Sequence, residues 1–453
     1  MKYRTILASI FLPLLFGACS GFFLFRHPDD FIRVRGIQLM HNGKPYYYGG
    51  TNLWYACYLG SPGETGDRAR LLRELDTLCA NGLVNVRVLA ASESSSIRRS
   101  VKPAIQRRPG EFDNDLLAGL DFVLAEMAER DMHAVLYLNN YWEWSGGMSQ
   151  YAAWSSGGGG VDPDDTTKGW QAFMNYSATF YANQKGNALF RDYVKSIVTR
   201  TNSINGRSYT EDPTIMAWQL ANEPRPGTLG EEGRNNLPDF YRWIDQTAAY
   251  IHSLDTNHLV STGSEGSVGC LMSAGYFLES HKTPNVDYLT FHLWPYNWGW
   301  FDPTHAEETL PVAEANSFAY IAGQIALARQ LRKPIVMEEF GLGRDGGVTE
   351  AGSPTISRDR FYKNILTVIV DSARAGAPIA GSNFWAWGGE GRGQHADHMW
   401  RRGDPYVGDP PQEPQGLNSV FSTDTSTLRI IRRQALKMLQ LSADDSLYAQ
   451  RAP

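Results

Sequence analysis

Cysteine is scarce in this chain. Four cysteines occur among 453 residues, and Cys57, Cys79 and Cys270 lack the CxxC or Cys/His spacing of a metal site. A disulfide framework and a Cys/His metal site are therefore not expected. We expect these three cysteines to be core residues, and a single disulfide among them is the alternative.

An excess of positive charge is also missing. The sequence has 42 Lys and Arg against 48 Asp and Glu, which gives a formal net charge of −6 at pH 7. Proteins that bind nucleic acids usually gather Lys and Arg on one face, so we expect no nucleic-acid partner. Aromatic residues, by contrast, are plentiful, with 13 Trp and 22 Tyr. Their flat rings suit the C–H faces of sugars, and a Trp-rich core is the alternative.

Only the N-terminus has a long apolar run. Lys2 and Arg4 precede apolar residues 6–16, and small residues then lead to Cys19. This pattern resembles a bacterial lipoprotein signal that is cleaved before a lipidated Cys19. An uncleaved anchor over 6–25 is the alternative, since about 20 apolar residues span a bilayer. Both place the body of the protein outside the cytoplasm. For the lipoprotein, Ser20 after Cys19 resembles outer-membrane sorting, with the protein in the periplasm or at the cell surface. The expected organisation is a signal peptide at 1–18, a tether at 19–30 and one domain at 31–453.

Short apolar runs alternate with longer helical patterns through the rest of the chain. In residues 68–82, for example, leucines recur at helical spacing and Gly82 ends the pattern. Eight such units predict an α/β fold, a (β/α)8 TIM barrel with a hairpin at 31–48 closing its bottom. A doubly wound sheet gives the same alternation. The expected strands are 46–50, 84–89, 134–138, 215–220, 259–262, 288–293, 335–339 and 379–385.

Two stretches interrupt this alternation. Residues 155–170 and 388–416 are rich in Gly and contain aromatic residues, and the second is also rich in Pro. Neither is expected to be helical. We expect both to be long loops at the C-terminal face of the barrel, where they wall a cleft.

Polar side chains and tryptophans collect where the predicted strands end. In a parallel barrel these ends converge on one rim, where catalytic residues lie. Two of the side chains, Glu223 and Glu339, are carboxylates on the fourth and seventh strands. Facing carboxylates suit glycosidic bond cleavage, and a metal site is less favoured because the histidines are not paired at ligand spacing. The strand-end residues are Arg87, Asn139, Asn140, Asn222, Glu223, His292, Trp294, Glu339, Trp385 and Trp387.

Four blocks resemble a known family. The segments "WQLANEPR", "FHLWPYNWGW", "VMEEFG" and "NFWAWGG" occur in this order on the fourth, sixth, seventh and eighth predicted strands. Together they resemble glycoside hydrolase family 5, in the clan of retaining (β/α)8 glycosidases, and within it the bacterial β-mannanases. The resemblance implies an endo-acting hydrolase of β-1,4-mannosidic bonds in mannan, glucomannan or galactomannan, without a metal or organic cofactor, and we expect a monomer. A β-1,4-glucanase, an exo-acting manno-oligosaccharide hydrolase and a non-catalytic glycan-binding lipoprotein are the alternatives.

The resemblance also assigns roles to residues. It implies Glu223 as the general acid/base and Glu339 as the nucleophile, with Glu338 as the rival for the second role. It implies that Arg87 keeps Glu339 ionised, that Asn222 binds the sugar 2-hydroxyl, and that Trp385 stacks on the reacting sugar, with Trp387 as the alternative. The remaining predicted substrate-binding residues are His292, Trp294, Trp54, Asn139, Trp142 and Arg225, with Trp298 as a further candidate.

Overall fold

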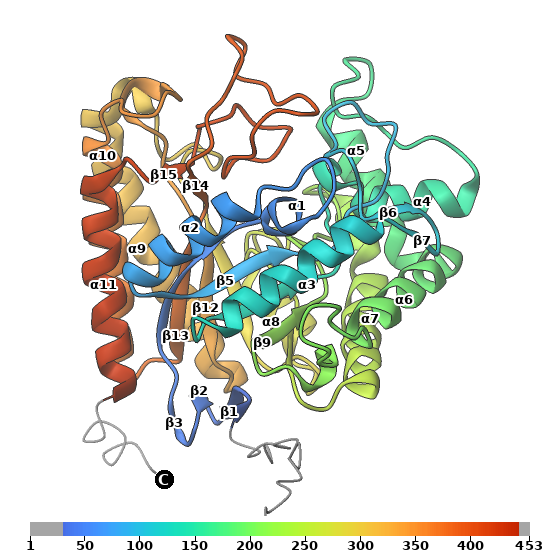
Figure 1. Cartoon of the computed structure of the whole chain (residues 1–453), viewed down its shortest axis with the longest axis horizontal. Helices are drawn as coiled ribbons and strands as arrows, with labels where there is room; N and C mark the ends of the chain where they lie inside the picture. The colour runs from blue at the N-terminus through green and yellow to red at the C-terminus, as the bar shows by residue number, and fades with distance from the viewer. Residues whose placement is uncertain (1–29, 444–453) are drawn as a thin grey trace, which may run out of the picture.

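Eight parallel strands form the central sheet of the computed structural model, which describes residues 30–443 (Figure 1). Their spatial order is β10-β9-β8-β5-β4-β13-β12-β11. The two outer strands meet, because the backbone of Asp287 donates to the Val260 oxygen at 2.8 Å and its side chain accepts from the Val260 nitrogen at 2.7 Å. The predicted (β/α)8 barrel and all eight predicted strands are therefore confirmed. The strands are β4 (Tyr48–Asn52), β5 (Leu83–Leu89), β8 (His133–Tyr137), β9 (Ile215–Gln219), β10 (Leu259–Ser261), β11 (Leu289–Leu293), β12 (Ile335–Phe340) and β13 (Ile379–Phe384).

Helices surround the sheet. The predicted helix at 68–82 is α2, whose Leu71, Leu75 and Leu78 are buried. Asp67 caps its first turn by accepting from the Arg70 nitrogen, and Gly82 follows its end with a φ of +73°. The helices are α1 (Ala56–Gly60), α2 (Arg68–Ala80), α3 (Asn114–Ala128), α4 (Gly147–Ser156), α5 (Gly169–Ala178), α6 (Gln184–Val198), α7 (Glu231–Leu254), α8 (Ala274–His281), α9 (Ala306–Leu331), α10 (Ile356–Arg374) and α11 (Thr425–Ala443), with 3-10 turns at Glu143–Ser145, Thr179–Ala182, Tyr209–Glu211, Pro303–His305 and Asp345–Gly347.

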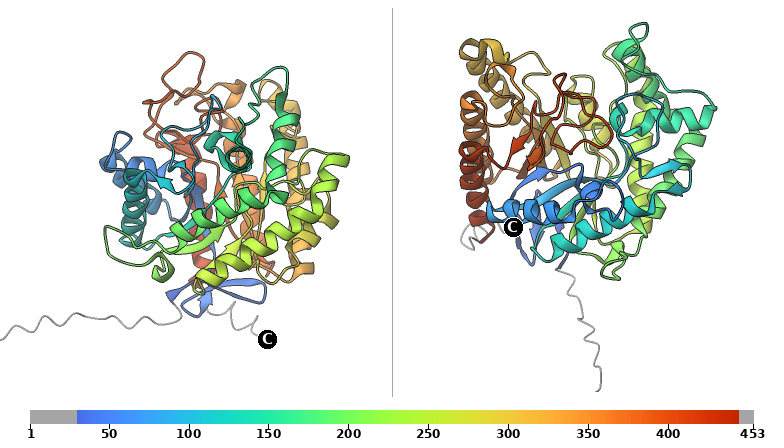
Figure 2. Two further views of the ribbon diagram at one scale, coloured as in Figure 1. Left: turned by 90° about the vertical axis from the view of Figure 1, so that its right-hand side faces the viewer. Right: turned by 45° about the horizontal axis from the view of Figure 1, so that its top comes forward.

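The two ends of the barrel differ. At the bottom, β1 (Arg33–Arg35), β2 (Gln38–His41) and β3 (Lys44–Pro45) pair antiparallel and bury Ile32 and Leu39 in a second apolar core, which confirms the predicted hairpin. At the opposite end stand the long loops (Figure 2). The predicted loop at 155–170 is helical at both ends, where α4 ends at Ser156 and α5 begins at Gly169, and only 157–168 contains no helix. The predicted loop at 388–416 contains no helix, and its first two residues belong to β14. Short strand pairs also lie outside the barrel sheet: β6 (Gln106–Arg108) with β7 (Glu111–Phe112), and β14 (Trp387–Gly389) with β15 (Val420–Phe421).

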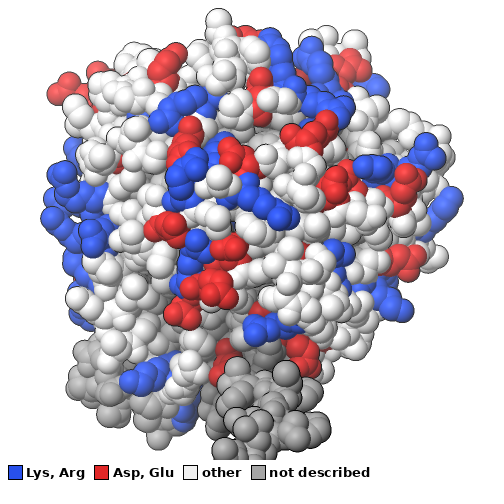
Figure 3. All heavy atoms as spheres, in the orientation of Figure 1, with Lys and Arg blue, Asp and Glu red and all other residues white. Residues whose placement is uncertain are grey.

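The molecular surface carries charges of both signs. On the face in Figure 3, basic and acidic side chains are interspersed.

Cys57 and Cys270 are buried, Cys79 is half-buried and all three are free, so the alternative of a disulfide among them is wrong. Within residues 30–443, no helix has the length and apolar character needed to cross a bilayer. The predicted signal peptide, Cys19 and most of the tether lie outside the described residues.

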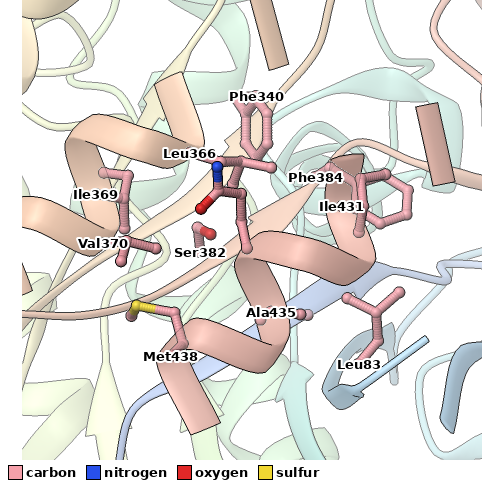
Figure 4. Close-up of a pocket in the computed structure, with 13 residues that line it drawn as sticks. Leu83, Phe340, Leu366, Ile369, Val370, Ser382, Phe384, Ile431, Ala435 and Met438 are labelled. Carbon is pink, nitrogen blue, oxygen red and sulfur yellow. The ribbon is translucent and has the colours of Figure 1, made fainter. Parts of the chain in front are cut away.

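Helices α10 and α11 pack closely against the sheet. Apolar side chains from both helices, including Ile369 and Ile431, meet Leu83 and Phe384 of the strands (Figure 4). The crevice between them has a volume of only about 10 Å³, too small for a ligand. The scaffold beneath the rim is therefore solidly packed.

Candidate active site

A cavity of about 540 Å³ opens at the carboxyl ends of the strands. This volume is typical of a small-molecule site. Its polar residues come from four successive strand ends and from the loop after β13. They are Asn222, Glu223 and Arg225 after β9, Glu265 after β10, Asn297 after β11, Glu339 on β12, and Gln412 and Glu413 on the loop.

The two predicted carboxylates face each other in this cavity. Glu223 follows β9 in a left-handed backbone conformation with a φ of +48°, and Glu339 lies on β12. One oxygen from each carboxylate and a nitrogen of His292 all lie within 4.8 Å of one another. Both side chains are almost fully buried. The geometry thus places two acids at opposite sides of one small space.

Arg87 organises the floor beneath Glu339. Its guanidinium is fully buried, with Nη1 2.5 Å from Glu339 Oε1. It also donates to Asn222 Oδ1 at 2.9 Å, Gln219 Oε1 at 2.8 Å and Asn52 Oδ1 at 3.1 Å. The predicted contact with Glu339 is therefore present. Arg87 does not line the cavity and therefore acts on Glu339 from beneath it.

His292 joins the two acids. Its Nδ1 lies 2.6 Å from Glu223 Oε1 and 3.2 Å from Glu339 Oε2. Burial, helped by the charge of Arg87, lowers the pKa of His292 well below its usual value, so the imidazole is neutral. The ring is fully buried and does not line the cavity. His292 therefore lies behind the carboxylates, whereas it was predicted to line the sugar subsite.

The carboxyls themselves are strongly perturbed. Burial is the main cause that raises the pKa of both Glu223 and Glu339, and the neighbouring charge of Glu223 raises the pKa of Glu339 further. The charge of Arg225, and less strongly that of Arg87, opposes the rise in the pKa of Glu223, and Arg87 opposes it at Glu339. Like charges this close cannot both be ionised cheaply, so the pair tends to hold one proton.

Tryptophans form much of the wall. Trp142 lines the cavity and donates its indole N–H to Glu223 Oε2 at 2.6 Å. Trp294 and Trp385 line it on the other side and meet edge to face, with 6.2 Å between ring centroids. Trp298 lines it as well, whereas Trp387 is fully buried and belongs to the core. The structure thus places Trp142, Trp294 and Trp385 in the cavity wall, and their substrate-binding roles stay predictions.

Two predicted substrate-binding residues lie elsewhere. Trp54 is 1% exposed, and its N–H donates to the backbone oxygens of Val407 and Gly408 at 3.1 and 3.0 Å. Asn139 is also buried and accepts from the backbone of Asn140. Neither lines the cavity. The loop after β13 folds back over Trp54, which explains why its ring does not reach the cavity.

Arg225 and Glu338 have structural partners. Arg225 lines the cavity, but its guanidinium is bound by both oxygens of Glu265 and lies over the Trp142 ring at 4.9 Å. Glu338 accepts from Gln219 Nε2 at 2.6 Å, is fully buried and does not line the cavity. Glu339, rather than Glu338, therefore faces the cavity.

Sequence reasoning missed several lining residues. Glu265 lies shortly after the end of β10 at Ser261, so its place near a strand end was a usable signal. Gln412 and Glu413 lie deep in a loop and carried no such signal. Each of the two has a buried side-chain oxygen without a hydrogen-bond partner among the described residues. Trp144, Trp170, Met174 and Leu417 also line the cavity.

Comparison with known proteins gives consistent results. Residues 29–443 match a family model described as GH family 5 beta-mannosidase-like. A "Putative mannan endo-1,4-beta-mannosidase 9" of Oryza sativa subsp. japonica is 31% identical over 79% of this chain and 81% of its own. "Mannan endo-1,4-beta-mannosidase 1" of Arabidopsis thaliana is 28% identical over 83% and 85%. The solved structure of a glycoside hydrolase family 5 mannosidase from Rhizomucor miehei superimposes with a TM-score of 0.84 at 33% identity, covering 92% of this chain and 100% of the other. A mutant of that mannosidase was solved in complex with mannosyl-fructose.

Proposed function

Because this chain belongs to the β-mannosidase-like group of glycoside hydrolase family 5, we propose that it hydrolyses β-1,4-mannosidic bonds in mannan, glucomannan or galactomannan. The observation that carries the proposal is the facing pair Glu223 and Glu339, with carboxylate oxygens within 4.8 Å. Retaining glycosidases hold their carboxyl groups about 5–5.5 Å apart, whereas inverting ones leave roughly 6.5–9.5 Å for a water. The pair therefore supports a double displacement with retention.

In the first step, a Glu339 oxygen attacks the anomeric carbon and the glycosidic C–O bond breaks. Glu223 gives its proton to the departing oxygen. In the second step, water attacks the anomeric carbon, Glu223 takes the proton of that water, and Glu339 leaves as a carboxylate. Glu223 is thus restored to its acid form at the end of each cycle.

The contacts decide which carboxyl holds the proton at the start. Glu339 has the Arg87 guanidinium 2.5 Å from one oxygen, which stabilises a negative charge there. Glu223 instead contacts the neutral indole of Trp142 and the neutral imidazole of His292, and the nearby cation Arg225 is paired with Glu265. The proton therefore resides on Glu223, as an acid catalyst requires. The Arg87 charge also disfavours a cation between the carboxylates, so we propose no metal or organic cofactor.

The sugar-binding roles follow from the cavity wall. Asn222 lines it beside Glu223, and its amide Oδ1 accepts from Arg87. Its Nδ2 donates one hydrogen to Asn140 Oδ1 at 3.2 Å, which leaves the second hydrogen for the 2-hydroxyl. Trp385 offers the ring on which the reacting sugar stacks, and Trp294 lies at its edge. A β-1,4-glucanase would bind an equatorial 2-hydroxyl in this subsite, because glucose carries that hydroxyl equatorially and mannose carries it axially. A non-catalytic binder is disfavoured because both acids and their partners are in place.

Cleavage from chain ends is the second candidate mode. None of the residues lining the cavity comes from residues 30–141, because Trp54 and the loop after β13 fill that side of the rim. The lining continues instead past Glu223 towards Arg225 and Glu265, where the leaving group lies. A site with little room beyond the reacting sugar favours short substrates and chain ends over internal attack. From the loop after β13, the side chains of Gln412, Glu413 and Pro414 line the cavity. Trp400, Arg401 and Arg402 of the same loop do not line it.

We also propose that the enzyme is exported as a monomeric lipoprotein anchored through Cys19. The support is the N-terminal sequence pattern. Metabolic labelling with a fatty acid should mark the wild type and not Cys19→Ala.

Product analysis tests the proposed activity. Wild type is incubated with mannan, carboxymethylcellulose and manno-oligosaccharides, with Glu339→Ala as the control. We expect cleavage of the mannosides only and almost none by the variant. Viscosity that falls early indicates internal attack, whereas release of mannose at constant viscosity indicates chain-end attack. Absence of mannoside cleavage by the wild type, or full activity of the variant, contradicts the proposal.

A further inference from the structure

The leaving-group side of the cavity has an aliphatic wall. Beyond Glu223 and Arg225, side chains from three segments line it, and they have little or no ability to hydrogen-bond a hydroxyl group. These segments are α5, the turn before α7 and the loop after β10. We define the outer wall as Met174, Leu229, Val268, Leu271 and Met272.

Two members of the outer wall are unusually exposed. The relative exposure of Leu229 is 65% and that of Met272 is 68%. Single exposed apolar residues are common, but a group of them lining one cavity marks a binding surface. The neighbouring Trp170, 45% exposed, extends the apolar surface towards Trp142, with 6.0 Å between the ring centroids.

The backbone of this wall is also strained. Leu271 and Met272 both have a φ of +55°, a left-handed conformation that costs roughly 1–2 kcal/mol for each such residue. Glycine would adopt it without that cost, yet the chain carries two large apolar side chains here. Gly233 lets Leu271 approach closely, because a Cβ at position 233 would lie 2.9 Å from Leu271 Cδ2.

Hydrogen bonds hold the wall in place. Asn175 Oδ1 on α5 accepts from both the nitrogen and the hydroxyl of Thr228 at 3.0 Å, and Asn236 donates to the Pro226 oxygen at 2.8 Å. The polar groups nearest this surface are already engaged, since Glu265 binds the guanidinium of Arg225. The wall is therefore preformed, and it offers few free donors for sugar hydroxyls.

We propose that this site accepts a leaving group that carries an apolar substituent, such as an alkyl or aryl alcohol or an acyl-esterified sugar. The inference rests on the proposed function, because it concerns the leaving-group side of the same retaining reaction. By microscopic reversibility, that side also binds any alcohol that replaces water in the second step. The alcohol oxygen then attacks the anomeric carbon, Glu223 takes the alcohol's proton, and Glu339 leaves.

A competition between two acceptor alcohols tests the inference. The result does not depend on whether the enzyme cleaves mannan internally or from chain ends. Mannotriose serves as the donor, with methanol and 1-hexanol present at equal concentration, and the two alkyl mannoside products are quantified. The two alcohols have similar intrinsic reactivity, so their product ratio reports binding. We expect at least a tenfold preference for hexanol in the wild type. Met272→Ser and Leu229→Ser should each reduce this preference at least threefold, and because both products form in one reaction, a change in the overall rate does not alter their ratio.

The matched control is Ile204→Ser, which removes another exposed apolar side chain, 48% exposed, outside the cavity lining. This control should keep the wild-type ratio. A second pair of acceptors, mannose and 6-O-acetylmannose, separates acyl sugars from simple alcohols as the source of the substituent. Equal use of methanol and hexanol, or a preference that survives both substitutions, overturns the inference while hydrolysis stands. Failure to cleave mannotriose or mannan overturns the proposed function as well.

Discussion

Trp142 donates its indole N–H to Glu223, with 2.6 Å between Nε1 and Oε2. A hydrogen bond to a carboxylate stabilises its charged form and lowers the pKa of the acid. Burial acts in the opposite direction and is the larger effect at Glu223. Trp142 therefore limits how far burial raises the pKa of the catalytic acid.

Replacing Trp142 with Phe should move the pH profile. The ring remains under Arg225, but this donor to Glu223 is lost, so the pKa of Glu223 rises further above its usual value. Because Glu223 must be protonated, the alkaline limb of kcat/KM should shift upwards in pH. The measurement is kcat/KM on mannotriose across pH, with Trp170→Phe as the control in the same wall. An unmoved alkaline limb contradicts this role.

Replacing Arg87 should damage both stability and activity. Arg87→Met leaves the buried carboxylates Glu338 and Glu339 without their cation, and breaking such a pair typically costs about 3–5 kcal/mol. The free energy of unfolding from urea titrations should fall by that amount at neutral pH. The loss should be smaller at pH 4, where the carboxyls become neutral. A pH-independent loss would indicate a packing role alone.

Strand ends were the most informative part of the sequence. Glu223 and Glu339 could be found because they end apolar runs that the barrel geometry brings together. The expectation that residues at strand ends meet at one rim also placed Trp142, Trp294 and Trp385 there. It did not show that His292 points at the carboxylates instead of into the cavity, whereas Arg87 contacts Glu339 as the resemblance implied.

Loop conformation could not be predicted. Trp54 looked like a subsite residue because nothing in the local sequence shows that residues 407–408 fold over it and accept its N–H. Glu413 was missed for the same reason, since its place in the cavity depends on contacts made by a distant segment. Such contacts depend on tertiary structure and leave no periodic signal in the sequence.

The buried carboxyl of Glu143 predicts a pH dependence of stability. Burial raises its pKa to about 8, against a usual value of 4.5. A group whose pKa is raised in the folded state stabilises the fold fully at low pH, and this contribution is lost as pH rises towards the folded pKa. Glu143→Gln should therefore lose less stability than the wild type between pH 5 and pH 8. Thermal melting at both pH values checks this, with exposed Glu211→Gln as the control.

Arg99 connects three segments around the cavity. Its Nε lies 2.7 Å from Asp164 of the Gly-rich loop, and its Nη1 donates to the Gln412 oxygen at 3.2 Å. Because Gln412 and Glu413 line the cavity, Arg99→Ala should loosen this wall and raise KM for mannotriose several-fold with little change in kcat. The ion pair between Arg99 and Asp164 is partly exposed, so the free energy of unfolding should change by less than about 1 kcal/mol. The matched control is Arg401→Ala, which breaks a bond to Asp397 within the same loop but away from the cavity. If both variants raise KM equally, the effect comes from general loosening of the loop and not from the link between Arg99 and Gln412.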